Sequence, residues 1–146
     1  MAVIETFSAS VSLEHLSGYR AEVRIRSFPP LALDEPESLG GADTGPSPLD
    51  YLLTAVGGCL LSSLTLCLQK KRVDPRLRAD VTGRVERDPD GLLRVQRIDV
   101  TMAVTAPEAD WKKVQGCFDI FKKYCIVSAS VARGIPIETR LDLSAP

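Results

Sequence analysis

Four cysteines and one histidine are the side chains in this 146-residue sequence that could carry covalent or metal chemistry. The cysteines are Cys59, Cys67, Cys117 and Cys125, and the histidine is His15. A zinc site needs ligands in closely spaced pairs, and the chain contains no C-x-x-C motif. A Cys–His hydrolase would need His15, which we expect on an exposed turn. No G-x-G-x-x-G or Walker-type loop is present, so we expect no cofactor and no metal, and chemistry that runs through thiols.

Each thiol taken alone fits inert packing in a core. Cys59 lies midway along the most hydrophobic segment of the chain. Cys125 differs because it opens the segment Tyr-Cys-Ile-Val-Ser just before a predicted helical turn, where backbone N–H groups can stabilise a thiolate. Cys67 and Cys117 each lie eight residues from one of these and lack polar sequence neighbours. We expect both to stay in the core.

The charged side chains offer few partners for a thiolate. Arg20, Arg24 and Arg26 share one face of a predicted strand, and such rows are mostly solvated. One guanidinium could instead be held against a thiolate and favour its charged form. Asp50 has a structural explanation, because Ser47 and Asp50 have the spacing of a helix capping box.

Composition bounds the class of protein. The chain has 18 basic and 19 acidic residues, 45% hydrophobic residues and 25% charged residues, as expected for one globular domain over residues 1–146. The near-zero net charge argues against a nucleic-acid partner. Residues 51–68 carry no charge, but small polar residues dilute them, and we expect a buried central helix, not a membrane span. The start lacks a basic secretory leader, so we expect a cytoplasmic protein whose thiols start reduced.

Periodicity places these residues on elements. Residues 3–13 and 19–26 alternate as a hairpin around a turn at residues 14–18. A long Pro- and Gly-rich connection follows at 29–48, with a short strand candidate at 31–33. The capping box then starts a helix that runs to about residue 72. Thr54, Gly58 and Ser62 form a stripe of small residues along it, which lets another backbone approach closely.

The second half reads as strands, helix and strand. Strands near 77–85 and 93–104 flank an Asp-Pro-Asp-Gly turn, and a change of phase near Gln96 predicts a bulge. A second capping box, Thr105 to Glu108, precedes a helix with an apolar face that reaches Phe121. A final strand covers 135–143. This order predicts an α+β fold with antiparallel sheets around a long central apolar helix.

Two blocks of the sequence closely resemble the OsmC/Ohr family. The first consists of Asp-Glu-Pro at 34–36, residues 40–50 and residues 52–59, which end at Cys59. The second consists of residues 124–128 around Cys125, followed by Gly-Ile-Pro-Ile at 134–137. The predicted element order matches along essentially the whole chain. The resemblance implies an intertwined homodimer, with the two central helices packed at its middle and a cysteine pair at each subunit boundary.

The resemblance also implies roles for residues. In peroxidase members the first cysteine attacks the O–O bond of an organic hydroperoxide and becomes a sulfenic acid. The second cysteine then forms a disulfide with it, which an external dithiol reduces. Carried over, Cys59 is the peroxidatic thiol and Cys125 the resolving thiol. Arg20, which follows the turn at Gly18, would hold the thiolate, and Asp50 matches a carboxylate of other OsmC-like branches.

Departures from the family pattern keep other functions open. Ile126 stands where the second block usually has Pro, and Leu49 stands where Ohr-type members have a Glu ten residues before the first cysteine. The turn before Arg20 also lacks a second Gly and a following Asp. These departures place the chain in an OsmC-like side branch. The alternatives are a non-enzymatic dimer that binds a small apolar ligand, and a thiol redox sensor that acts on a protein partner.

Overall fold

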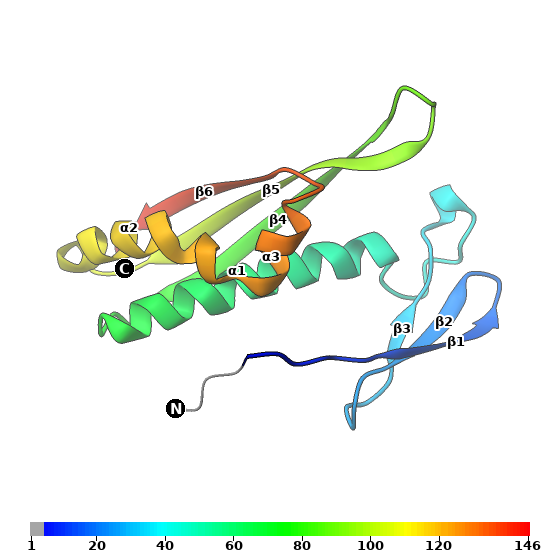
Figure 1. Cartoon of the computed structure of the whole chain (residues 1–146), viewed down its shortest axis with the longest axis horizontal. Helices are drawn as coiled ribbons and strands as arrows, with labels where there is room; N and C mark the ends of the chain where they lie inside the picture. The colour runs from blue at the N-terminus through cyan, green and yellow to red at the C-terminus, as the bar shows by residue number, and fades with distance from the viewer. Residues whose placement is uncertain (1–4) are drawn as a thin grey trace. The chain divides into compact units, whose positions relative to one another are not determined.

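A computed structural model describes residues 5–146 as an α+β chain, as predicted (Figure 1). Its packing divides into two compact units, Met1–Tyr51 and Leu52–Pro146. The first contains a small three-stranded sheet, and the second contains a larger three-stranded sheet with helices. The helix α1 begins in the first unit and continues through the second.

The first unit is an antiparallel sheet in the order β1-β2-β3, formed by Ser12–Ser17, Arg20–Arg24 and Leu31–Leu33. The predicted hairpin forms, but its bounds are wrong. Residues 5–11 of the predicted strand 3–13 form no regular structure, residues 12–13 lie in β1, and residues 14–17, expected in the turn, are also part of β1. Val3 lies outside the described residues. The pairing of Ser12 with Arg24 is the last one between β1 and β2. Arg26 then turns the chain with a positive φ of 47°, so the residues before Ser12 have no strand to pair with.

A buried carboxylate organises the long connection that precedes α1. Asp34 is 1% exposed and accepts hydrogen bonds from the Glu35 N–H at 2.8 Å, the Thr44 N–H at 3.0 Å and the Thr44 hydroxyl at 2.7 Å. These bonds, with that of Thr44 Oγ1 first, lower the pKa of Asp34 to about 2. At Gly41 a Cβ would overlap the Glu35 carbonyl, so only glycine fits this loop.

The second unit contains the sheet β4-β5-β6, formed by Arg76–Arg87, Leu93–Thr105 and Ile137–Ser144. β4 and β5 are antiparallel, and the register moves from Arg84↔Arg97 to Val85↔Val95, which leaves Gln96 as the predicted bulge. β5 and β6 are parallel, which corrects the expectation of antiparallel sheets. The helical connection between β5 and β6 returns the chain to the end of the sheet where β5 began, so the two strands run in the same direction. Alternating residues occur in parallel and antiparallel strands alike, so the sequence pattern could not distinguish them.

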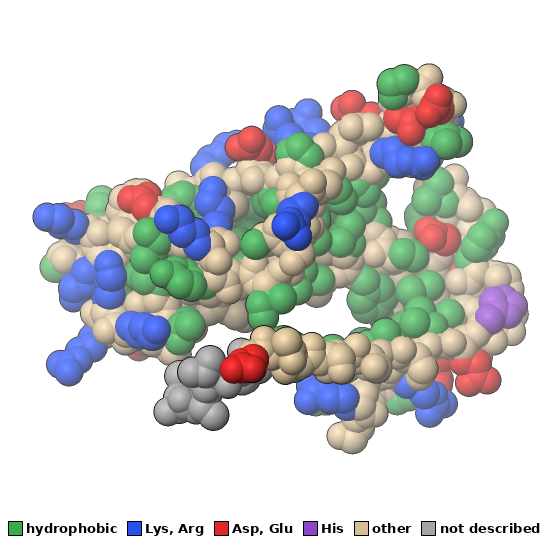
Figure 2. Space-filling model, viewed as in Figure 1, with side chains coloured by type: hydrophobic (Ala, Val, Ile, Leu, Met, Phe, Trp, Pro, Cys, Tyr) green, Lys and Arg blue, Asp and Glu red, His purple; other side chains and the backbone are tan. Residues whose placement is uncertain are grey.

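The helix α1, Pro48–Lys70, starts at the predicted capping box. The Asp50 N–H donates to Ser47 Oγ at 3.2 Å, and the Ser47 N–H donates to the Asp50 carboxylate at 2.8 Å. At the other end Arg72 has a positive φ of 57° and stops the helix. Lys and Arg side chains gather where α1 ends and α2 begins (Figure 2), which suits the negative end of the α1 dipole.

The second predicted capping box does not form. Thr105 stays at the end of β5, where its hydroxyl lies 3.3 Å from that of Ser144. Pro107 instead precedes the short 3-10 helix η2, Glu108–Asp110. The helix α2 follows at Trp111–Ile120, then a 3-10 turn η3 at Phe121–Tyr124, and then the short helix α3 at Ile126–Val131. Pairing with β6 therefore holds Thr105 in a strand, although the local sequence pattern predicted it as a helix cap.

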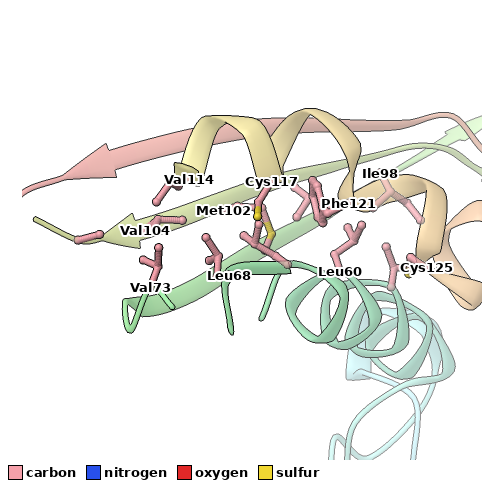
Figure 3. Packing of buried hydrophobic residues seen from close by; sticks show 14 residues of the cluster. Leu60, Leu68, Val73, Ile98, Met102, Val104, Val114, Cys117, Phe121 and Cys125 are labelled. Carbon is pink, nitrogen blue, oxygen red and sulfur yellow. The ribbon is translucent and has the colours of Figure 1, made fainter. Parts of the chain in front are cut away.

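The core of the second unit lies between one face of β5 and two helical segments (Figure 3). The buried residues come from β5 (Ile98, Val100, Met102, Val104), from α1 (Val56, Leu60, Leu64, Leu68) and from α2 and η3 (Val114, Cys117, Phe121). A Cβ added at Gly57 would lie 2.7 Å from Val81 Cγ2, so this glycine lets α1 approach β4 closely. By length and composition alone α1 could cross a membrane. However, its Val56, Leu60, Leu64 and Leu68, which recur every four residues along one face, pack in this core.

The Asp34 hydrogen bonds predict a defined loss of stability in acid. The folded pKa of about 2 lies below the ordinary value of 3.8, so the ionised carboxylate stabilises the fold fully above pH 4. That stabilisation is lost as the pH falls through 4 toward 2. Asp34→Asn should lower Tm by several degrees at pH 6, and the difference from the wild type should shrink toward zero at pH 2, measured by thermal denaturation.

The exposed Glu37, in the same loop, provides the control. Glu37→Gln should leave the pH profile of Tm as in the wild type. An Asp34→Asn profile parallel to that of the wild type between pH 2 and 6 would contradict the assigned role of Asp34.

Candidate active site

Two of the predicted site residues meet in the second unit. Cys59 of α1 and Cys125 at the start of α3 form a disulfide across 66 residues, with their Cα atoms 5.8 Å apart. Cys59 is half-buried and Cys125 is 1% exposed. Cys125 lies at one end of the core, near Leu60 and Ile98 (Figure 3). The two thiols are therefore placed to interconvert between a dithiol and a disulfide.

Backbone N–H groups of α3 point at both sulfur atoms. The Ser128 N–H donates to Cys125 Sγ at 3.3 Å, and the Val127 N–H donates to Cys59 Sγ at 3.4 Å. Cys125 is the N-cap residue of α3, with extended φ and ψ of −85° and 110°. Its sulfur thus takes the place of the oxygen that usually accepts the free N–H groups of a first turn. This arrangement confirms the predicted helical turn and gives each sulfur atom one backbone N–H donor.

Ile126, in place of the family's Pro, leaves this geometry intact. It is the first residue of α3, a position where the backbone N–H has no partner within the helix and where Pro is often found. The N–H groups that reach the sulfur atoms belong to Val127 and Ser128, the next two residues. The side chain of Ile126 is 65% exposed. The departure therefore removes neither donor.

The other predicted site residues belong to the first unit. Arg20 begins β2 and has an exposed side chain. The carboxylate of Asp50 accepts the Ser47 hydrogen bonds of the α1 cap. The roles of Arg20 and Asp50 at the thiols remain predictions. His15 lies exposed on β1 beside the hairpin turn, where its Nε2 is 2.9 Å from the Gly18 carbonyl oxygen, as expected for a surface residue.

The remaining cysteines form a second disulfide that the sequence interpretation missed. Cys67 of α1 and Cys117 of α2 are joined with their Cα atoms 5.7 Å apart. Both lie in the core as expected, but as a cross-linked pair and not as inert thiols. The spacing carried the signal. Cys67 follows Cys59 by eight residues and Cys117 precedes Cys125 by eight. When two segments run antiparallel, a residue eight positions after one member of a pair lies opposite the residue eight positions before the other member. Cys67 therefore lies opposite Cys117 once Cys59 lies opposite Cys125.

The fold and the cysteine pair define a class: an α+β chain with two sheets, a long central helix and a disulfide from that helix to a helix N-cap. The family model of OsmC-like proteins matches residues 40–140. The chain belongs to the OsmC-like protein family. A comparison with curated proteins finds no significant match.

Solved structures share the fold at low sequence identity. An OsmC-like protein from Mycoplasma pneumoniae is 19% identical, with a TM-score of 0.79 over 97% of this chain and 99% of its own. An organic hydroperoxide resistance protein from Elizabethkingia anophelis is 18% identical, with a TM-score of 0.71 over 98% and 100%. The organic hydroperoxide resistance protein OhrB of Bacillus subtilis is 20% identical, with a TM-score of 0.63 over 94% and 98%. At these identities the likeness establishes the fold.

A proline scan of the first turn of α3 tests how the sulfur atoms are held. Ile126→Pro should fold normally and raise stability by up to about 1 kcal/mol, because Cys125 already has the extended backbone that a residue before Pro requires. Val127→Pro is the matched control. It removes the N–H that reaches Cys59 and places Pro after the helical Ile126, so it should lower Tm by several degrees.

The measurements are Tm and the rate of iodoacetamide alkylation of reduced Cys59 at neutral pH. Alkylation should slow in Val127→Pro and stay as in the wild type in Ile126→Pro. Equal alkylation rates in the two variants would rule out the assigned role of the Val127 N–H.

Proposed function

We propose that this protein reduces organic hydroperoxides, with Cys59 as the peroxidatic thiol and Cys125 as the resolving thiol. The observation that carries the proposal is the Cys59–Cys125 disulfide with one backbone N–H on each sulfur atom. Membership of the OsmC-like family and the likeness to organic hydroperoxide resistance proteins support a peroxide-related redox function.

The proposed cycle has three steps that balance. The Cys59 thiolate attacks one oxygen of the O–O bond, and the alkoxide leaves and takes a proton to give an alcohol and a Cys59 sulfenic acid. The Cys125 thiolate then attacks the Cys59 sulfur, the S–O bond breaks, and the oxygen leaves as water. An external dithiol restores both thiols and becomes a disulfide itself.

The N–H groups of α3 act on the thiolate stages of this cycle. The Val127 N–H would hold the charge on Cys59 before attack on peroxide. The Ser128 N–H would hold the charge on Cys125, both as the nucleophile that closes the disulfide and as the leaving group when the dithiol opens it. This placement supports thiol chemistry without an imidazole base. We include Arg20 in the proposal, as the guanidinium that holds the Cys59 thiolate.

We also propose that two copies of the chain form a homodimer through α1, in the cytoplasm. Thr54, Gly58 and Ser62 lie on an exposed face of α1 at four-residue spacing, as required for a close helix–helix contact. The exposed Leu66 continues this face with 52% of its surface accessible. The proposed partners are thus a second copy of the chain and an external dithiol, and the proposed substrate is an organic hydroperoxide.

Peroxide titration tests the activity. Reduced protein with one equivalent of cumene hydroperoxide should lose two hydrogens by intact mass, and peptide mapping should place the new bond between Cys59 and Cys125. Cys59→Ser should abolish peroxide consumption. Cys125→Ser should stop at a sulfenic acid that dimedone traps. Arg20→Met should slow the first oxidation about tenfold, which corresponds to about 1.4 kcal/mol of lost thiolate or transition-state stabilisation.

The other outcomes discriminate between functions. If Cys59→Ser behaves like the parent and no hydrogens are lost, peroxide reduction is excluded, and a ligand-dependent rise in Tm would indicate a binding protein. Oxidation at Cys59 without sustained peroxide consumption in the presence of dithiols would indicate a redox sensor.

A substitution at Gly58 tests the dimer. A Cβ added at Gly58 meets no atom of the same unit within 4 Å, and replacing glycine in a helix interior gains up to about 1 kcal/mol. Gly58→Leu should therefore leave the protomer folded and separate the dimer, measured by size-exclusion chromatography with light scattering. Gly58→Ala is the matched control and should dissociate the dimer less. A Gly58→Leu protein with the mass of the wild-type assembly would contradict the proposed interface.

A further inference from the structure

The second disulfide, Cys67–Cys117, holds the same segment of the chain that carries Cys125. Cys117 lies in the last turn of α2, four residues before the η3 turn, Phe121–Tyr124, and Cys125 directly follows that turn. Both ends of this nine-residue segment, residues 117–125, are tied to α1, at Cys67 and at Cys59. We infer that Cys67–Cys117 is a lasting cross-link that positions Cys125 for closure onto Cys59. This inference rests on the proposed peroxide cycle and assigns a role to two cysteines outside it.

Direct exchange between the two disulfides is excluded by the length of α1. Cys59 and Cys67 are eight residues apart on a continuous helix, which separates their backbones by about 12 Å along its axis. Sulfur atoms must come into contact for thiol–disulfide exchange. Cys67–Cys117 is therefore not a relay that reduces Cys59–Cys125, and the two pairs respond to an external dithiol separately.

Burial makes the second disulfide the harder one to reduce. Cys117 is fully buried beside Met102 and Phe121 (Figure 3), so an external thiolate can reach only Cys67, which lines a small surface pocket with Leu66, Ile120 and Tyr124. That attack would expel the Cys117 thiolate into the apolar core, where no hydrogen-bond donor to its sulfur is found among residues 5–146. Attack on Cys59 instead expels the Cys125 thiolate, which accepts the Ser128 N–H. A less stabilised leaving thiolate leaves more slowly.

The cross-link matters when Cys59 and Cys125 are reduced. Without their bond, the segment that carries Cys125 is still fixed to α1 at Cys117, eight residues upstream. A short fixed tether limits how far Cys125 can move from Cys59, and so it favours closure over competing reactions. The competing reaction is attack of the Cys59 sulfenic acid on a second hydroperoxide, which adds a second oxygen to give the sulfinic acid and releases an alcohol.

The order of reduction is the first test. The oxidised protein is treated with increasing dithiothreitol, alkylated and mapped by mass spectrometry. Cys59 and Cys125 should become alkylated at a dithiothreitol concentration at least tenfold below that required for Cys67 and Cys117. Opening of both pairs at one concentration, or of Cys67–Cys117 first, would overturn the inference. This readout uses no peroxide, so it is independent of the proposed function.

The second test measures positioning. Cys67→Ala/Cys117→Ala should lower Tm by about 10 °C, because the cross-link closes a loop of about fifty residues. The peroxide concentration that converts half of Cys59 to sulfinic acid should fall about tenfold, since slower closure leaves the sulfenic acid exposed for longer. Val104→Ala is the stability control. It opens the core at the end opposite Cys125 (Figure 3) and should lower Tm without changing that concentration.

Each outcome decides one claim. If wild-type Cys59 gives no sulfenic acid, the proposed function fails, while the reduction order still reports on the cross-link. If the alanine pair and the wild type reach half sulfinic acid at one concentration, or if Val104→Ala shifts it equally, the positioning role is wrong. Cys67→Ser, which keeps the Cys117 thiol in its place, provides the same readout should the alanine pair fail to fold.

Discussion

The structure of the site depends on one alignment, in which residues 117–125 run antiparallel along α1. Phe121 is fully buried at the middle of that segment, and Leu60 and Leu64 are buried on the facing part of α1. Apolar burial of this kind is worth about 1.5–3 kcal/mol for each large side chain. It brings together cysteines that are 66 and 50 residues apart in the chain. The disulfides lie at the ends of this packed contact and fix its register.

The chemistry depends on how α3 begins. A free first turn offers N–H groups without helical partners, and serine, threonine or aspartate usually accepts them. Here two sulfur atoms accept them instead, one from α3 itself and one from α1. The donors are backbone groups fixed by local geometry, so the contacts to the sulfur atoms involve no histidine. The single histidine of the chain lies on the exposed hairpin.

The sequence predicted correctly those features of the fold that depend on interactions between neighbouring residues. The capping box at Ser47, the bulge at Gln96 and the turn after Cys125 each depend on a few neighbouring residues, and each was predicted from them. The errors lie where distant pairing decides. Alternation could not show that β6 runs parallel to β5, or that Thr105 would stay in a strand beside Ser144. The Cys67–Cys117 bond required the antiparallel alignment as well as the spacing.

Two departures from the family pattern have different consequences. Ile126 stands where the family usually has Pro, but the sulfur atoms are contacted by the backbone N–H groups of the next two residues, so this change leaves the geometry of the cysteine pair unaltered. Leu49 moves the carboxylate one residue along α1 to Asp50, and one residue turns the direction of a side chain by about 100° around a helix. At that position the carboxylate accepts the Ser47 N–H and hydroxyl and closes the helix cap. The change therefore affects the helix cap and does not alter the N–H groups that contact the sulfur atoms.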